Sequence, residues 1–208
     1  MPKIKLWPKT HHCDRAIVAM AIGLLAGCGS TLMPSQDTGS QDPMADQEQA
    51  VYAALLRNAS NAPYYVLREE LPDFSQSNED VAADSDLIIQ NLTQVSVETL
   101  ASLWARNGTV HYLSADMNLG APYVLLDSAA REAFFTADGD GWKRFYAKYP
   151  KSTGIYGFSR VGFNAANDQA LVYLDWYGGY LAGLGQCVIL AKSGDTWTVV
   201  QQVETWIS

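Results

Sequence analysis

The last third of the chain contains four segments rich in β-branched and aromatic residues, namely IYGFSRVGFN (155–164), QALVYLDWY (169–177), QCVILAK (186–192) and TWTVVQQVETW (196–206). The residues between them are mostly Gly, Asn, Asp and Ser, which favour turns. Within the segments the side chains alternate, so that one face of the second is formed by Ala170, Val172, Leu174 and Trp176. This pattern predicts a four-stranded antiparallel meander with one buried face.

Helical patterns precede the meander. The best runs from Val97 to Arg106, with Ser96 as its N-cap and Asn107-Gly108 at its end. Other helices are expected from about Glu48, from Asp127 or Ser128 to Phe135, and after Asp140, where Trp142, Phe145, Tyr146 and Tyr149 recur at helical spacing. Short strands are expected at 64–71, 110–113 and 123–126, and an exposed acidic loop at 73–86. We therefore expect an α+β domain over residues 50–208, with helices packed on one face of a curved antiparallel sheet.

The first residues of the chain have the three parts of a secretory signal. Residues 1–15 carry four Lys or Arg against one acid, an apolar run follows from Ala16, and small residues precede Cys28. The apolar stretch 16–28 has 13 residues, whereas a helix that spans a bilayer needs about 20. The segment therefore predicts export, with residues 1–27 as a signal peptide.

The end of this segment, Leu25-Ala26-Gly27-Cys28, resembles the lipobox of bacterial lipoproteins. The resemblance implies cleavage between Gly27 and Cys28 and acylation of Cys28. The expected partner is then the lipid bilayer, into which the acyl chains on Cys28 insert. Several acyl chains anchor a protein durably, whereas a single chain binds only marginally. Residues 28–49, which are rich in Ser, Gln, Asp and Gly, are then a flexible lipidated tether. In the lipoproteins that the motif resembles, an Asp directly after the acylated Cys often signals retention in the inner membrane. The resemblance therefore implies that Gly29 at this position favours the outer membrane of the cell envelope.

The charge balance bears on partners. The chain has 14 Lys and Arg against 22 Asp and Glu, for a net charge of -8. Removal of residues 1–27, which hold four basic residues and one acid, leaves 10 basic and 21 acidic residues. Nucleic acid is therefore not expected as a partner, because phosphate binding needs a basic surface. Cys187 becomes the last thiol, and its apolar setting predicts a buried, inert side chain.

The sequence nominates no catalytic residue, metal ligand or cofactor. Asp138-Gly-Asp140 begins like a calcium loop, but Tyr149 stands where such a loop needs Glu, so Asp140 is better explained as a helix cap. His111 is the last histidine after cleavage and is expected to be structural, because zinc sites need several ligands. Glu69 and Glu70 are adjacent in an expected strand, so they cannot face one cleft. Whether the protein is an enzyme stays open, with a non-catalytic role favoured.

Four residues form the candidate ligand site: Ser159, Arg160, Tyr173 and Trp176. Arg160 interrupts an apolar strand, so it either pairs with an acid such as Asp175 on the next strand or binds an anion. Fifteen of the 23 aromatic residues lie between Phe134 and Trp206. They could line a pocket for a small apolar ligand, or they could simply fill a core.

Ser159-Arg-Val-Gly-Phe-Asn164 and Ala170-Leu-Val-Tyr173 lie in a region of about 65 residues that resembles a group of uncharacterised bacterial proteins. The order of helices and meander is also similar, more loosely, to the NTF2-like (cystatin-like) fold, which hosts both enzymes and binding modules. No activity comes with either resemblance, and we predict an envelope lipoprotein whose domain binds a protein or small molecule without catalysis. The alternatives are an NTF2-like hydrolase or isomerase and a structural component of an envelope assembly.

Overall fold

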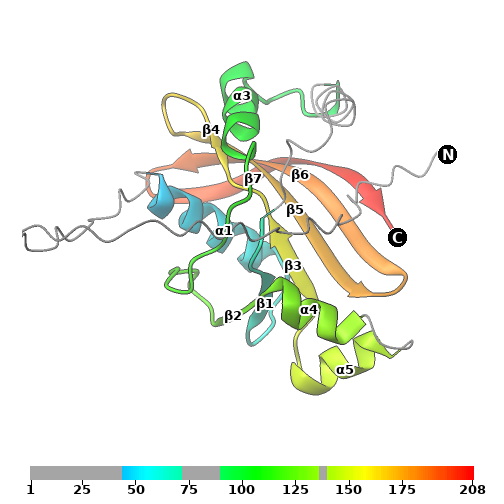
Figure 1. Ribbon diagram of the computed structural model, residues 1–208. Coiled ribbons are helices and arrows are strands. Elements are labelled where there is room, and N and C mark those ends of the chain that lie inside the picture. Colours follow the sequence, from blue (N-terminus) through cyan, green and yellow to red (C-terminus); the bar gives the residue numbers. More distant parts are fainter. Residues whose placement is uncertain (1–43, 72–89, 136–139) are drawn as a thin grey trace, which may run out of the picture.

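A computed structural model describes residues 44–71, 90–135 and 140–208. In these residues one mixed sheet has the strand order β2-β1-β3-β5-β6-β7, with β4 paired to β5 (Figure 1). The expected signal peptide, its expected cleavage site at Gly27 and Cys28, and the expected acidic loop 73–86 lie outside the described residues. None of the described helices is long and apolar enough to span a membrane.

Helices and strands are mixed along the chain, which confirms the α+β class. The helices are α1 (Ala45–Ala59), α3 (Val97–Arg106), α4 (Ser128–Phe135) and α5 (Gly141–Lys148). The strands are β1 (Tyr65–Arg68), β2 (Tyr123–Leu126), β3 (Ile155–Phe158), β4 (Gly162–Phe163), β5 (Gln169–Gly179), β6 (Ala182–Ser193) and β7 (Thr196–Ile207). The expected strand 110–113 is wrong, because that segment makes only an isolated bridge between Glu70 and Tyr112.

The antiparallel meander is confirmed, but the sheet as a whole is mixed. Strands β3, β5, β6 and β7 pair antiparallel in that order. Strand β1 instead runs parallel to both of its neighbours, β2 and β3. The connections β1 to β2 and β2 to β3 contain α3 and the α4–α5 pair, and parallel neighbours need such long crossovers.

The expectation that the helices cover one face of the sheet is wrong, because they cover both. Helix α1 packs on one face, against the side chains of Leu67, Phe158, Val172 and Trp197. The opposite face carries α3 over Leu171 and Ile189 at one end of the sheet and α4–α5 over Val66 and Ile155 at the other, as Figure 1 shows. Successive strand residues point to opposite faces, so the apolar residues between the expected ones, such as Leu171, give the second face its own core.

Helix α1 begins at Ala45, so the last five residues of the expected tether belong to the globular domain. The helical register places Glu48 on the same face as Val51, Tyr52 and Leu55, and all four are buried. Glu48 is 7% exposed, which is tolerated only because two arginines neutralise it, as described below. The domain therefore starts no later than Met44, where the first helical hydrogen bond of α1 is accepted.

The expected strand 155–164 is broken into β3 and β4 because its central residues bond to side chains. The amide of Asn107 brackets Arg160, accepting from its N–H at 2.8 Å and donating to its carbonyl at 3.0 Å. The N–H of Val161 donates to Glu48 Oε1 at 2.8 Å. The N–H of Ser159 still donates to the carbonyl of Tyr173 on β5 at 2.9 Å, whereas the N–H groups of Arg160 and Val161 leave the sheet ladder and bond to side chains instead.

The glycine-rich segment 178–185 was expected as a connection, but most of it is strand. β5 continues to Gly179 and β6 begins at Ala182, with Tyr180 and Leu181 at the turn. The indole of Trp206 on β7 covers Gly183 and Gly185, where a Cβ would collide with it. Glycine in a strand often marks such a close approach, and the aromatic ring supplies the packing that the glycines lack.

Candidate functional site

The four predicted ligand residues do not form one site. Ser159 is fully buried, and its hydroxyl accepts from the N–H of Tyr173 and donates to the carbonyl of Arg160, each at 2.9 Å. Its carbonyl accepts from the Tyr52 hydroxyl at 2.8 Å. Ser159 therefore ties α1, β5 and the β3–β4 junction together, and its hydroxyl is occupied.

Arg160 pairs with an acid, as one of its two predicted roles required, but the partner is Glu48 rather than Asp175. The Arg160 Nε lies 3.0 and 3.1 Å from the two Glu48 oxygens, and Nη2 lies 2.9 Å from Oε2. Arg106 of α3 adds a third contact to Glu48, Nη2 to Oε1 at 3.1 Å. Asp175 is paired instead with Arg68, with Nη2 to Oδ2 at 2.9 Å.

This cluster borders a small cleft of about 180 Å³ to which Glu48, Tyr52, His111 and Arg160 contribute. Burial, and secondly the charge of Glu48, raise the pKa of Tyr52 well above its ordinary value. The carboxylate of Glu48 already accepts hydrogen bonds from two guanidinium groups and one backbone N–H. Its oxygens are therefore occupied by structural contacts. The cleft is therefore a poor candidate for acid or base chemistry.

Tyr173 and Trp176 lie on opposite faces of β5. The Tyr173 hydroxyl accepts from the indole N–H of Trp206 at 2.8 Å, and burial raises the pKa of Tyr173. The indole N–H of Trp176 donates to the carbonyl of Thr153 at 2.9 Å, and its ring packs against the core under α1. Three residue positions separate the two side chains along a strand, an odd number, so they cannot converge on one ligand.

The remaining predicted residues are structural where they are described. Cys187 is 3% exposed, as a buried thiol should be. Asp140 occupies the N-cap position of α5, but its side chain makes no capping hydrogen bond, so that prediction is wrong. Among residues 44–71, 90–135 and 140–208, no three His, Cys, Asp or Glu side chains are grouped as metal ligands would be.

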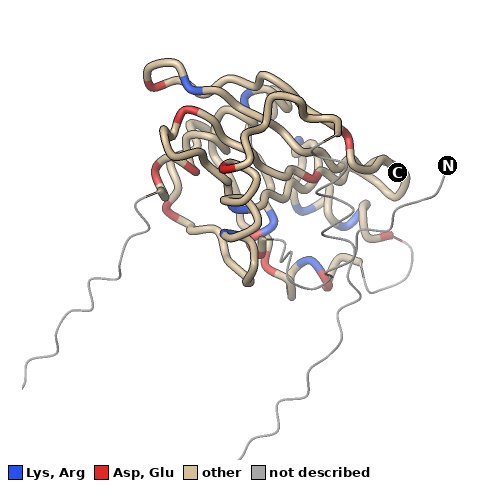
Figure 2. Tube along the Cα trace, turned by 90° about the horizontal axis from the view of Figure 1, so that it is seen from above, with Lys and Arg blue, Asp and Glu red and all other residues tan. Residues whose placement is uncertain are grey.

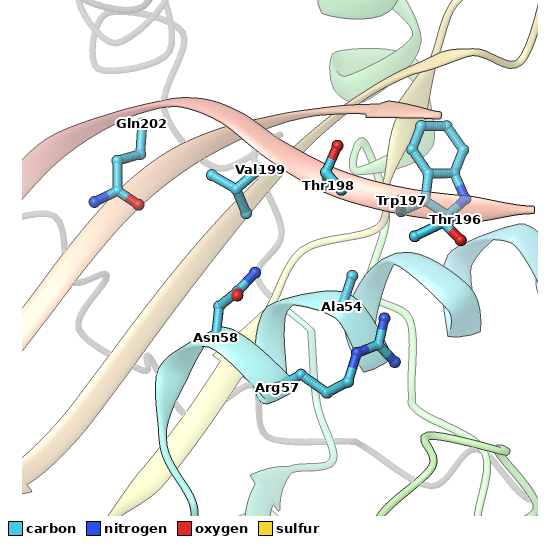
Figure 3. A pocket seen from close by; sticks show the side chains of 8 residues that line it. All are labelled: Ala54, Arg57, Asn58, Thr196, Trp197, Thr198, Val199 and Gln202. Carbon is cyan, nitrogen blue, oxygen red and sulfur yellow. The ribbon is translucent and has the colours of Figure 1, made fainter. Parts of the chain in front are cut away.

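The larger cavity is a groove between α1 and β7, with a volume of about 480 Å³ (Figure 3). We call it the α1–β7 groove. Its lining comprises Ala54, Arg57 and Asn58 of α1 and Thr196, Trp197, Thr198, Val199 and Gln202 of β7. Arg57 and Asn58 are exposed and project from the C-terminal half of α1 toward β7 (Figure 3). The lining offers hydroxyls, amides and one cation, with no carboxylate, histidine or thiol among it.

The α1–β7 groove reaches the edge of the sheet. Four consecutive residues, Thr196 to Val199, line it, and consecutive strand residues point to opposite faces. A groove that touches all four must therefore meet the main chain of β7 from the side. β7 is the last strand in the sheet order, and among the described residues its outer edge pairs with no other strand.

Sequence reasoning missed the residues of this groove. Glu48, which borders the smaller cleft and not this groove, was missed as well, although the sequence indicates that it is buried, because it shares the apolar helical face of Val51, Tyr52 and Leu55. Arg57, Asn58 and Gln202 carry no comparable signal, because polar residues on an exposed face look alike whether or not a groove adjoins them. Their juxtaposition depends on which strand lies at the sheet edge above α1.

In comparisons with known proteins, no family model, no curated protein and no solved structure matches the chain.

Proposed function

We propose that this protein is a membrane-anchored envelope lipoprotein whose domain serves as a non-catalytic interaction module, with the α1–β7 groove as its contact surface. The observation that carries the interaction module is the groove itself, which lies along a strand edge that no other described strand pairs with and is lined by hydroxyls, amides and one guanidinium rather than by carboxylates, histidines or thiols. Such a lining can orient a partner through hydrogen bonds, whereas acid–base catalysis, or activation of a threonine hydroxyl as a nucleophile, needs a general base that the lining lacks.

The anchor rests on residues 16–28 and their resemblance to a lipobox. An acylated Cys28 would hold the domain at the outer membrane, and residues 29–43 would separate it from the headgroups. About 15 flexible residues span roughly 20 Å, enough for a partner in or on the same envelope to reach the groove. Basic positions are interspersed with acidic ones in the described trace (Figure 2), but the chain after Gly27 has 21 acidic against 10 basic residues, so anionic lipid headgroups would on balance repel the domain rather than bind it.

Intact mass spectrometry of membrane-extracted protein tests the anchor, with wild type beside Cys28→Ala. The expected wild-type mass lacks residues 1–27 and includes acyl chains, whereas the variant carries no lipid. A wild-type mass that begins at Met1 without lipid would refute the lipoprotein assignment.

Photo-crosslinking in the living cell tests the contact surface. A photoreactive amino acid at Gln202, in the groove, is compared with one at Asp116, which is exposed on a loop that does not line it. Adducts formed from position 202 and absent from position 116 are expected. Equal labelling from both positions, or none, would reject the groove as an interaction surface.

The alternative of an NTF2-like hydrolase or isomerase predicts a carboxylate in the principal cavity. Glu48, the acid that borders the smaller cleft, is engaged in the ion-pair cluster with Arg106 and Arg160 described above. We therefore favour the interaction module.

A further inference from the structure

We propose that the partner of the α1–β7 groove is a second copy of this chain, bound by antiparallel pairing of β7 with β7 about a two-fold axis. The inference rests on the proposed function, in which this groove is an interaction surface, and it names the occupant. It is carried by three observations: the main-chain groups at the edge, a register that matches these groups about one axis and accommodates two bulges, and the charged side chains that the described residues place at the edge and in the groove.

The first observation concerns the free main-chain groups of β7. Ser193 and Thr196 flank a two-residue turn in which Gly194 has φ +58°, so they form a hydrogen-bonded pair and the pairs alternate from there. From the other end, Ser208 and Gly183 exchange both backbone hydrogen bonds. Counting from either end, and allowing for one extra residue at Val200 and one at Thr205, the groups that face away from β6 belong to Trp197, Val199, Gln202, Glu204 and, next to the C-terminus, Ile207.

The second observation is that these outward groups match each other about one axis. An axis between Val200 and Gln201 places Trp197 opposite Glu204 of the second copy and Val199 opposite Gln202 of the second copy. All four residues turn their main-chain groups outward. Their side chains lie on the α1 face, because their partners on β6 are alternate residues that share the face of Val188 and Leu190, namely Lys192 for Trp197, Leu190 for Val199, Val188 for Gln202 and Gln186 for Glu204. Two residues that oppose each other in an antiparallel pair must have their side chains on the same face, and to form a hydrogen-bonded pair both must turn their N–H and C=O groups toward the partner strand. This register satisfies both conditions.

The same register accommodates the bulges. The extra residue Val200 falls opposite Gln201 of the second copy, at the axis, and the extra residue Thr205 falls opposite Thr196. A one-residue shift of the axis would oppose residues on different faces. One register is therefore preferred.

The third observation is charge complementarity. Glu204 is the only charged residue of β7, and Arg57 is the only charged residue among the described ones that line the groove. No ion pair links Arg57 to another described residue. Glu204 of the second copy, opposite Trp197 and on the α1 face, would lie beside the groove that Arg57 lines. By symmetry the contact occurs twice.

The edge itself also favours a partner strand. Edge strands of many proteins carry Lys or Pro, which discourage pairing with strands of other chains. The twelve residues of β7 include neither, and Val200 and Ile207 are 43% and 69% exposed. Anchoring of all copies in one membrane would raise their local concentration. A self-complementary strand edge would then pair with another copy of the chain in preference to more dilute partners.

Sedimentation velocity of the full chain, extracted in detergent, tests the proposal. Wild type is expected to reach a monomer–dimer equilibrium that depends on concentration. Arg57→Glu and Glu204→Arg, each made alone, place like charges together at both contacts and should weaken the dimer about tenfold or more. Lys143→Glu and Asp116→Arg, matched reversals at exposed positions that neither line the groove nor lie on β7, should leave it unchanged.

Mixing decides the identity of the partner. In a one-to-one mixture of Arg57→Glu and Glu204→Arg, the mixed dimer has opposite charges at both contacts, so dimerisation should return toward the wild-type level. The doubly substituted chain should dimerise for the same reason. A change that merely damages the fold would not be rescued by mixing.

Two results would overturn the proposal: a wild-type chain that stays monomeric at every concentration, and a mixture that dimerises no better than its components. Crosslinking from Gln202 separates this failure from failure of the proposed function. An adduct with the mass of two copies supports self-pairing, and an adduct with a different protein keeps the interaction surface but rejects the second copy. No adduct rejects both.

Discussion

Each buried charge in the described part of the chain has an opposite charge beside it. Glu48, Arg68 and Asp175 are all less than a tenth exposed. Arg68 meets Asp175 across β3, and Glu48 meets Arg106 and Arg160 from two other elements. An uncompensated charge in these positions would cost several kcal/mol, so each pair selects the fold in which its members meet.

Glu48→Gln should destabilise the domain by about 3 kcal/mol, because it leaves the guanidinium groups of Arg106 and Arg160 without a counter-charge. Urea unfolding, followed by tryptophan fluorescence, measures the change. Asp46→Asn, an exposed carboxylate in the same helical turn, is the control and should cost under about 0.5 kcal/mol. Similar losses for both variants would contradict the role given to the cluster.

Gly157→Ala should cost about 3 kcal/mol because a Cβ there would collide with both the carboxylate of Asp175 and the guanidinium of Arg68. The ion pair crosses β3 directly above this glycine, and the added methyl would force it apart. Gly179→Ala is the matched control, since its Cβ would meet only Ala182 at an ordinary 3.5 Å. Chemical denaturation of the two variants side by side checks the difference, and a neutral Gly157→Ala would show that the ion pair does not need this space.

At the scale of elements, α3 and α5 show how differently two helices of similar pattern begin. Ser96 caps α3, its hydroxyl accepting from the N–H of Thr99 at 3.1 Å. Asp140 occupies the same position before α5 without such a bond. Helix α5 is held instead by aromatic packing of Phe145 and Trp142 against Phe134 and Phe135 of α4.

Ser96→Ala should therefore lower the free energy of unfolding by about 1 kcal/mol, the usual cost of losing an N-cap. Asp140→Ala should change it by less than about 0.5 kcal/mol, because no capping bond is lost. Thermal unfolding of both variants, monitored by circular dichroism, provides the comparison. An equal or larger loss at Asp140 would mean that its carboxylate caps α5 in solution.

At the scale of the whole molecule, the buried Tyr52 and the partly buried Tyr173 and Tyr177 make stability depend on alkaline pH. Burial raises the pKa values of Tyr52, Tyr173 and Tyr177 above the ordinary value near 10. The unfolded chain then loses these protons at a lower pH than the folded chain does. Their contribution to stability is complete below pH about 10 and is lost as the pH rises beyond it.

Alkaline titration should show the ionisation of these tyrosines, followed by absorbance at 295 nm, coinciding with loss of the far-ultraviolet circular dichroism. Tyr177→Phe should shift the unfolding midpoint to higher pH, since it removes one group that ionises preferentially in the unfolded chain. Full ionisation near pH 10 with the fold intact would contradict the burial of these hydroxyls.

The amino-acid sequence alone was sufficient for features encoded over short distances. The bounds of α3 and its Ser96 cap, the helices α4 and α5, and the antiparallel order of β5, β6 and β7 were all predicted from helical spacing, alternation and turns. These patterns persist because hydrogen bonds within a helix or hairpin join residues close together in the chain.

Only the tertiary structure decided the rest. Glu48 meets Arg160 across 112 residues, β1 enters the sheet parallel to its neighbours, and β7 rather than another strand forms the edge beside Arg57. Local patterns cannot specify such contacts, because a buried strand has the same alternation in any order within the sheet and an arginine has the same charge beside any acid. The relative energies of whole arrangements choose among them, and the candidate site arises from that choice.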